Sequence, residues 1–402
     1  MASTLPSSPG PALGCELAVL GGGLIGLAIA WRAAQAGLSV SLADPAPGSG
    51  ASTAAAGMLA PVTEAQYGEE RLLELNLRSA RRYPEFVREL EAATGLPAGF
   101  DQRGTLAVAF DRDDRAVLAE TADYHRKLGL DSAPLSGREA RALEPMLAPG
   151  VQAGLWVEGD HQVDNRLLHA ALLKAATDAG VRIHRTGAAL LVERDVVRGL
   201  RLETGEALMA DQVVLAAGCR SSEVPGLPPD ALPRVRPVRG QILRLAMPTP
   251  HLLSRTVRAM VRGSYVYLVP RAHGELVIGA TVDELGFDTF VTAGGVYELL
   301  RDAHDVVPGV TELPLVEMRT GLRPCSPDNA PLLGPCALPG LIAATGHYRN
   351  GVLLTPVTAD AITALLVDGV LPQYAQAFSP TRFAAAATAA AGSPSTPSGA
   401  VR

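Results

Sequence analysis

Charged residues are scarce in this sequence, and basic residues form no cluster. Of the 402 residues, 19% are Asp, Glu, Lys or Arg, and the formal net charge is −6. Proteins that bind nucleic acid or an anionic membrane usually carry a basic patch, so we expect neither as a partner. Hydrophobic residues make up 48% of the chain, which is enough to bury a large core in about two domains.

Cysteine and metal-ligand patterns are also missing. The four cysteines, at positions 15, 219, 325 and 336, show no C-x-x-C spacing. This argues against structural zinc and favours free thiols in a reducing compartment, so we expect a cytoplasmic protein without a metal site. The sequence contains no Ser/His/Asp or Cys/His arrangement that indicates nucleophilic catalysis.

The two ends of the sequence contain little that could be buried. Residues 1–14 lack Lys and Arg, so the positive region of a secretory signal is missing and a flexible arm is predicted. The apolar run that follows contains Glu16 and Gly21 to Gly23, which fit a strand and turn better than a membrane span. Residues 384–402 are mostly Ala, Ser, Pro, Gly and Thr, which predicts a disordered tail.

A glycine-rich turn near the N-terminus carries the strongest motif. A buried strand, Leu17 to Leu20, leads into Gly21-x-Gly23-x-x-Gly26, and the helix that follows ends at Gly37. Gly21 permits a tight turn, Gly23 lets backbone N–H groups approach a pyrophosphate, and Gly26 lets helix and strand pack closely. The motif predicts dinucleotide binding at the positive end of the helix.

The next strand, Ser39 to Ala43, supports this interpretation because it ends at Asp44. An acidic side chain there can accept hydrogen bonds from both hydroxyls of an adenosine ribose, and it disfavours a 2′-phosphate. Glycines in a purely structural turn are the alternative, but the strand, the helix and the acid coincide. The motif alone does not separate FAD from NAD.

Small residues dominate the segment Gly48 to Pro61, where a flat ring system or a phosphate could lie close to the backbone. Ser52 and Thr53 could cap a helix or bond a ligand, although the segment could also be a linker. Further along, helices are predicted over residues 69–95 and 112–129.

The middle of the chain indicates a flavoprotein. A helix capped by Asp164 precedes a hairpin from Gly187 to Glu203 and a buried strand, residues 213–218, that closes on Gly218. A nicotinamide dehydrogenase would instead alternate βαβ throughout. Residues 237–280 follow with period two and predict three strands of an antiparallel sheet.

Tyrosine and arginine side chains are the candidates for a substrate site. Tyr265 and Tyr267 share one face of the predicted sheet, toward either a cleft or cross-strand neighbours. Arg323 and Arg349 are predicted in loops, where each could hold a carboxylate through two N–H groups or form a structural ion pair. A turn at Gly351 then directs a helix N-terminus toward an anion or an electron-rich ring.

These motifs resemble the D-amino acid oxidase superfamily of FAD-dependent oxidoreductases. Within it, the chain is similar to the glycine oxidases of the thiamine pathway, through GSGASTAAAGMLAP, VDNRLLHAALL, YLVPR, GLRPCSPDNAPLLG and, most specifically, GHYRNGVLLTP. The resemblance implies an α/β (α+β, two-domain) fold, with a Rossmann-type FAD-binding domain and a substrate domain built on an antiparallel β-sheet flanked by helices. The predicted domains are 15–85, 150–225 and 320–383 for FAD, and 86–149 and 226–319 for the substrate.

The resemblance also implies non-covalent FAD. Relatives similar to sarcosine oxidase attach FAD through a cysteine that would align with Gly321, and Cys325 lies four residues further on. A local departure from the family follows Gly218, where Cys219 stands in place of an aromatic residue. The implied FAD contacts are Gly21, Gly23, Leu24, Ile25, Gly26, Asp44, Pro45, Ala51, Ser52, Ala56, Gly57, Met58, Val192, Gly218, His347, Tyr348, Arg349, Asn350, Gly351, Val352 and Leu353.

For the substrate, the resemblance implies that Arg323 holds a carboxylate, assisted by Arg349 and the Tyr267 hydroxyl. The α-hydrogen would pass to the flavin as hydride, and water would hydrolyse the imine to glyoxylate or a 2-oxo acid and ammonia. Dioxygen would then reoxidise the flavin and yield hydrogen peroxide. Partners would be a small amino acid and dioxygen, with a functional link to thiazole synthase and homo-oligomers as further expectations.

Three functions stay open at this point. The first is an oxidase of glycine, sarcosine or small D-amino acids, which includes the sarcosine oxidase-like variant acting on N-methyl amino acids. The second is a D-amino acid dehydrogenase that passes electrons to a quinone. The third is a non-catalytic nucleotide-binding protein, which would have no reason to place two arginines and a tyrosine around a flavin.

Overall fold

The structure, a computed structural model, describes residues 13–248 and 252–383. Most of the predicted arm and the whole predicted tail therefore lie outside the described residues. Of the arm, Leu13 and Gly14 are described, and they belong to strand β1 because they pair with Leu208 and Met209. The first strand thus begins four residues before the predicted Leu17.

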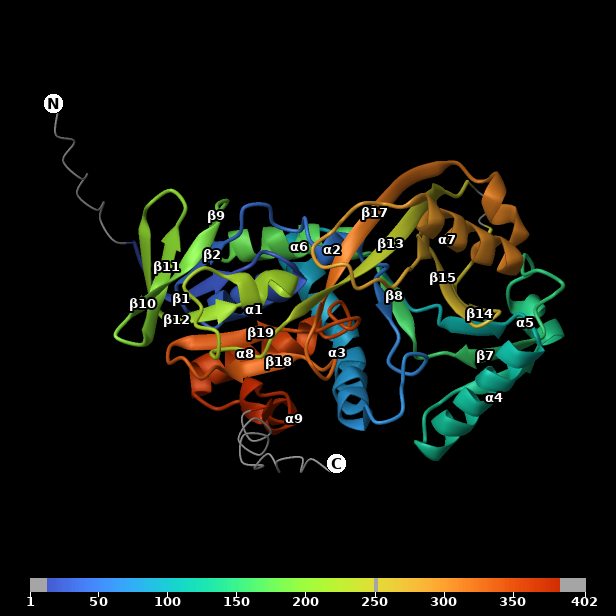
Figure 1. Ribbon diagram of the computed structural model, residues 1–402, viewed down its shortest axis with the longest axis horizontal. Coiled ribbons are helices and arrows are strands. Elements are labelled where there is room, and N and C mark those ends of the chain that lie inside the picture. Colours follow the sequence, from blue (N-terminus) through green and yellow to red (C-terminus); the bar gives the residue numbers. More distant parts are fainter. Residues whose placement is uncertain (1–12, 249–251, 384–402) are drawn as a thin grey trace, which may run out of the picture.

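An eight-stranded sheet occupies the left part of Figure 1. Its order is β10-β11-β12-β1-β2-β9, with β19 beside β12 and β18 beside β19. The central strands β12, β1, β2 and β9 are parallel, as a dinucleotide-binding unit requires. The strands are β1 (Leu13–Leu20), β2 (Val40–Ala43), β9 (Arg182–His184), β10 (Ala188–Glu193), β11 (Val196–Leu202), β12 (Ala207–Leu215), β18 (Leu332–Pro335) and β19 (Leu341–Thr345).

Four helices pack with this sheet in one apolar core. They are α1 (Leu24–Gln35), α3 (Glu70–Thr94), α6 (Asn165–Asp178) and α8 (Thr355–Asp368). Helix α1 contacts both α6 and α8, and it buries apolar residues on most of its surface, Trp31 among them. Asp164 caps α6 as predicted, because its side chain accepts the N–H groups of Arg166 and Leu167.

A second eight-stranded sheet forms the right part of Figure 1, with α7 above it, α4 below it and α5 at its right edge. Its order is β17-β13-β16-β15-β14-β5-β7-β6, and most neighbours are antiparallel. The elements are β5 (Thr105–Ala109), β6 (Ala133–Ser136), β7 (Ala153–Val157), β13 (Arg236–Ala246), β14 (Thr256–Val261), β15 (Ser264–Pro270), β16 (Glu275–Gly279), β17 (Leu315–Cys325), α4 (Arg112–Lys127), α5 (Gly137–Leu143) and α7 (Ala293–Val306).

The remaining elements are short. A three-stranded sheet has the order β3-β8-β4, and the others are helices of four to six residues. Their bounds are β3 (Met58–Leu59), β4 (Phe100–Asp101), β8 (His161–Val163), α2 (Ala51–Ala54), α9 (Gln373–Gln376), η1 (Gly218–Glu223), η2 (Pro308–Glu312) and η3 (Pro380–Phe383).

Two sequence predictions about the second sheet were wrong. Residues 237–280 form four strands, since β14 also lies within this range. Arg323 lies in the long edge strand β17 and not in a loop, because β17 pairs with β13 along its whole length and Arg323 lies opposite Val238. Arg349 does lie in a turn, between β19 and α8, as predicted.

The domain division stays a prediction, and we propose two changes to it. The boundary at residue 86 would cut α3, which packs on α6 and α8 of the first sheet. The boundary at residue 320 would cut β17, which pairs only with β13 of the second sheet among the described strands. Both elements belong whole to the layer that they contact.

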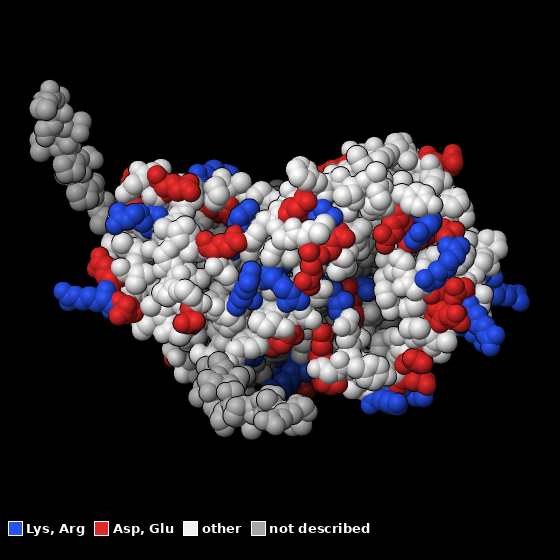
Figure 2. Space-filling model, in the orientation of Figure 1, with Lys and Arg blue, Asp and Glu red and all other residues white. Residues whose placement is uncertain are grey.

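Charges of both signs are interspersed on the face shown in Figure 2. Within residues 13–248 and 252–383, no helix combines the length and the apolar character that crossing a membrane requires. The same part of the chain holds no cluster of His, Cys, Asp and Glu suited to a metal ion.

Candidate active site

A cavity of about 440 Å³ lies where the two sheets meet. The first sheet contributes the β1–α1 turn, the ends of β2 and β12, and the turn before α8. The second sheet contributes side chains of β13, β15 and β17, and the segment of residues 48–58 forms another wall. A cavity between the carboxyl ends of parallel strands and an antiparallel sheet is a usual place for a dinucleotide with a substrate beyond it.

The β1–α1 turn is built for close approach of backbone to a ligand. Gly21 has φ 117°, and a Cβ there would lie 2.4 Å from the Ala216 oxygen. A Cβ on Gly26 would lie 1.9 Å from the Gly21 oxygen, so this glycine lets helix and strand pack as predicted. Ser52 Oγ accepts the Leu24 N–H at 3.1 Å and borders the space beside Gly23. These residues fit a pyrophosphate at the N-terminus of α1.

Asp44 lies at the end of β2 and lines the cavity, as predicted. One carboxylate oxygen accepts the Gly22 N–H at 2.6 Å, and the other accepts the Ala46 N–H at 2.7 Å. Each oxygen keeps a lone pair for a further donor, so the carboxylate can hold the turn and still accept ribose hydroxyls.

The turn between β19 and α8 forms the wall that carries His347. Burial lowers the pKa of this side chain to about 3, so its ring is neutral near pH 7. Its Nε2 lies 3.0 Å from the Thr358 hydroxyl of α8. Tyr348 has φ 46°, and its N–H donates to the Pro324 oxygen of β17 at 2.7 Å. The turn is therefore tied both to α8 and to the second sheet.

Arg323 of β17 and Tyr267 of β15 line the same cavity. Arg323 Nη1 donates to the main-chain oxygens of Arg239 and Thr281, at 3.3 and 3.2 Å. Its guanidinium lies against Gly240, where a Cβ would be 2.5 Å from both Nη atoms. No carboxylate of the described residues lies within 4.0 Å of Arg323, so its charge is available to a ligand. Tyr265, by contrast, is exposed.

Glu64 was not found by the sequence analysis, yet it lines this end of the cavity. It forms an ion pair with Arg258 of β14 at 2.5 Å, and its second oxygen lies 4.0 Å from Arg349 Nε. No motif marks Glu64, because its partners come from β14, which was missed, and from a turn almost 300 positions away. Only the fold brings these three charges together.

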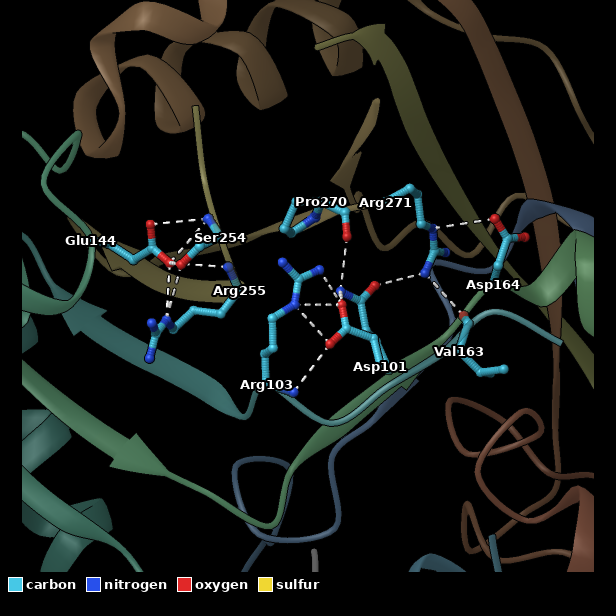
Figure 3. A network of polar contacts seen from close by, with 10 residues as sticks. Asp101, Arg103, Glu144, Val163, Asp164, Ser254, Arg255, Pro270 and Arg271 are labelled. Atoms are coloured by element: carbon cyan, nitrogen blue, oxygen red, sulfur yellow. Dashed lines mark hydrogen bonds and ion pairs between the residues drawn. The ribbon is translucent and has the colours of Figure 1, made fainter. Parts of the chain in front are cut away.

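Arg271, from the YLVPR motif, supports the cavity from behind. Figure 3 shows its side chain reaching from the end of β15 toward Val163 and Asp164. It donates to the Val163 and Ala56 oxygens at 2.9 and 2.7 Å, and to the Gln162 side chain at 2.7 Å. Burial lowers its pKa to about 10, so it stays charged near pH 7. Because Ala56 lines the cavity, Arg271 fixes one wall to the second sheet.

The structure gathers nearly all the predicted site residues around one cavity. Gly26 does not line it and acts in packing, and Val192 does not line it either, since it lies in β10 of the hairpin. Cys325 is buried away from the cavity, with its Sγ 3.0 Å from Asn329 Oδ1, whereas Gly321 does line it. The predicted residues that line the cavity are Gly21, Gly23, Leu24, Ile25, Asp44, Pro45, Ala51, Ser52, Ala56, Gly57, Met58, Gly218, Tyr267, Arg323, His347, Tyr348, Arg349, Asn350, Gly351, Val352 and Leu353.

The fold and the glycine-rich cavity define a flavin-dependent oxidoreductase. Residues 16–365 match the family described as FAD dependent oxidoreductase, and the chain belongs to this family. The glycine oxidase of Geobacillus kaustophilus is 34% identical over 87% of this chain and 92% of its own. The crystal structure of glycine oxidase from that organism superimposes with a TM-score of 0.84, at 33% identity, over 92% of this chain and 99% of that one.

The bifunctional protein ThiO/ThiG of Synechocystis sp. is another relative, 36% identical over 92% of this chain. The chain spans about half the length of that protein, 54%. The comparisons confirm the predicted family, the two-sheet fold and FAD as cofactor. The prediction of an FAD-dependent oxidoreductase is thereby confirmed by the family to which the chain belongs.

Proposed function

We propose that this protein oxidises glycine, and with it sarcosine or small D-amino acids, with dioxygen as the electron acceptor. The observation that carries the proposal is Arg323, whose guanidinium faces the cavity without a carboxylate partner among the described residues. Leaving an arginine charge without a counter-ion in a partly buried site is costly, so the site is complementary to a carboxylate ligand. Relatives named glycine oxidase support the choice of substrate.

In this proposal the protein positions the substrate and excludes water. Arg323 holds the substrate carboxylate, and the Tyr267 hydroxyl donates a further hydrogen bond to it. FAD, when bound, supplies the two-electron oxidant for the C–N bond. The neutral His347 adds no charge to the wall behind the site, and no side chain is needed as a general base.

We further propose that FAD is held without a covalent bond. The N-terminus of α1 would hold the pyrophosphate, Asp44 the adenosine ribose, and the turn before α8 the ring system. Cys325 is buried and engaged with Asn329, and the position expected for a covalent link is Gly321. Denaturation in acid should therefore release all the flavin into the supernatant.

The similarity to ThiO/ThiG proteins supports a place beside thiazole synthase, with the imine of glycine as the shared compound. We also propose a cytoplasmic location, from the scattered cysteines, and a homo-oligomer. The alternatives are a D-amino acid dehydrogenase that uses a quinone and a sarcosine oxidase-like enzyme that prefers N-methyl amino acids.

A peroxide assay over glycine, sarcosine, D-Ala, D-Pro and L-Ala tests the proposal most simply. Glycine, sarcosine or a D-amino acid should give peroxide in proportion to the substrate consumed. Turnover with a quinone and none with dioxygen would favour the dehydrogenase. L-Ala as the best substrate would contradict the proposed pocket.

A further inference from the structure

A buried carboxylate lies at the substrate end of the cavity, and the proposed reaction does not use it. The Glu64 side chain is 13% exposed and lines the cavity together with Tyr267, Arg323 and Arg349. Burial alone would raise the pKa of Glu64, but the charges of Arg258 and Arg349 hold it below its usual range. Glu64 is therefore ionised near pH 7 and places a negative charge inside the cavity.

The backbone holds Glu64 in place before any ligand binds. Asp160 accepts the N–H groups of Val62 and Thr63, at 3.0 and 2.7 Å, and the Thr63 hydroxyl at 2.7 Å. These bonds fix the turn immediately before Glu64. At its other side, Glu64 bonds Arg258 of β14, so its carboxylate cannot move freely to admit a second anion.

Arg323 and Arg349 differ in their protein partners, because Glu64 and Gln66 contact Arg349. The Gln66 amide, in the orientation that satisfies its hydrogen bonds, accepts from both terminal nitrogens of Arg349 at 2.6 and 3.0 Å. Arg349 Nε lies 4.0 Å from Glu64. Arg349 is thus engaged by protein groups, whereas Arg323 bonds only main-chain oxygens among residues 13–248 and 252–383. Without Glu64, the cavity would offer two guanidinium groups and could hold two carboxylates.

We propose that Glu64 determines specificity by restricting the site to substrates with a single carboxylate. Its carboxylate, paired with Arg258 and 4.0 Å from Arg349 Nε, repels a second carboxylate beside Arg349, while Arg323 holds the first. The inference rests on the proposed function of Arg323, and it assigns Arg349 to the protein's own ion-pair network and not to the substrate.

Two ligands that are not oxidised provide a matched test. Methoxyacetate has one carboxylate and the shape of sarcosine, and diglycolate replaces its methyl group with a second carboxymethyl arm. Binding of each to the FAD-loaded protein is followed by the change in the flavin absorption spectrum, without turnover. The measured quantity is the dissociation constant of diglycolate divided by that of methoxyacetate.

The parent should bind methoxyacetate and disfavour diglycolate. In Glu64→Gln, which keeps the size of the side chain, the ratio should fall about tenfold or more, because a like charge a few ångströms away is removed. Glu74→Gln, an exposed charge on α3, changes the net charge equally and should leave the ratio unchanged. In Glu64→Gln, the kcat/KM for sarcosine divided by that for iminodiacetate should fall in the same way.

Equal binding of both acids by the parent would overturn the proposal, even if Glu64→Gln did not fold. So would an unchanged ratio in a Glu64→Gln variant that retains FAD. In both cases, binding of methoxyacetate would still support the proposal that Arg323 binds the substrate carboxylate. A parent that bound neither acid would instead overturn the proposed function, and this inference with it.

Discussion

Asp44 has two roles in this cavity, and substitutions at this position can separate them. Asp44 accepts the N–H groups of Gly22 and Ala46, and it also presents lone pairs where an adenosine ribose would lie. The sequence predicted the second task from the position of Asp44 after a strand. It could not predict the first, because the path of the Gly22 backbone depends on the folded turn.

Replacing Asp44 tests the proposed ribose contact. Asp44→Ala should weaken FAD binding by about 1.5–3 kcal/mol, since hydrogen bonds to a charged acceptor are lost. Asp44→Asn keeps one acceptor and should lose less. Titration of the apoprotein by flavin fluorescence gives both dissociation constants. An unchanged constant in Asp44→Ala would mean that Asp44 only holds the turn.

His347 makes stability depend on pH in a defined window. Its pKa is lowered by burial to about 3, whereas a histidine in the unfolded chain titrates near 6.5. Between these values the unfolded chain binds more protons, so the free energy of unfolding rises with pH, by up to about 1.4 kcal/mol per unit. The contribution is complete above about pH 6.5.

In His347→Gln, the contribution of His347 to the rise of the free energy of unfolding with pH should disappear. Urea unfolding at several pH values between 4.5 and 7 measures it, with saturating FAD throughout. His304→Gln, at an exposed position of α7, is the control and should keep the parental slope. An identical slope in parent and His347→Gln would show that the imidazole is not held neutral.

At the scale of elements, the motifs were predicted better than the strands that carry charge. The β1–α1 turn and the cap of α6 follow from local chemistry, since glycine and aspartate have clear backbone preferences. β14 and β17 were missed because Arg258, Arg319 and Arg323 interrupt their apolar pattern. Arg258 and Arg323 approach the cavity. The charged residues that break the apolar pattern of these strands are therefore residues of the site.

Strand β13 supports Arg323 through Gly240, and this contact can be tested. In Gly240→Ala the new methyl group would meet the guanidinium at about 2.5 Å and displace it. KM for glycine should rise about tenfold or more, with FAD retained, because the carboxylate contact is misplaced. Gly294→Ala, where a Cβ meets nothing within 4 Å, should behave like the parent. A parental KM in Gly240→Ala would place the substrate elsewhere.

At the scale of the whole molecule, Arg271 joins the second sheet to strand β8 and to the cavity wall at Ala56. Arg271→Leu would leave the Ala56 and Val163 oxygens without this donor, at a cost of about 1–3 kcal/mol for each buried acceptor. Both the free energy of unfolding and the FAD content should fall. Arg103→Gln, a partly exposed neighbour in Figure 3, is the control and should change neither strongly. Parental stability in Arg271→Leu would contradict the role of this network.

The overall architecture could be predicted from the sequence, but the charge balance of the cavity could not. The Rossmann motif, the hairpin and the period-two strands indicated a flavoprotein with a second sheet. Arg323 is open to a ligand, whereas Arg349 is engaged by Glu64 and Gln66. This difference depends on contacts between segments far apart in the chain, which the sequence does not show.

The central claim is that Arg323 holds the substrate carboxylate, and steady-state kinetics on glycine test it most directly. Arg323→Lys keeps the charge but not the paired N–H groups, so about one charge-assisted bond, roughly 1.5–3 kcal/mol, should be lost. That corresponds to about a 10- to 150-fold lower kcat/KM, chiefly through KM, since the carboxylate is unchanged by the reaction. Arg323→Ala should lose more, with the flavin spectrum of the parent in both. Near-parental kcat/KM in both variants, with FAD retained, would contradict the account.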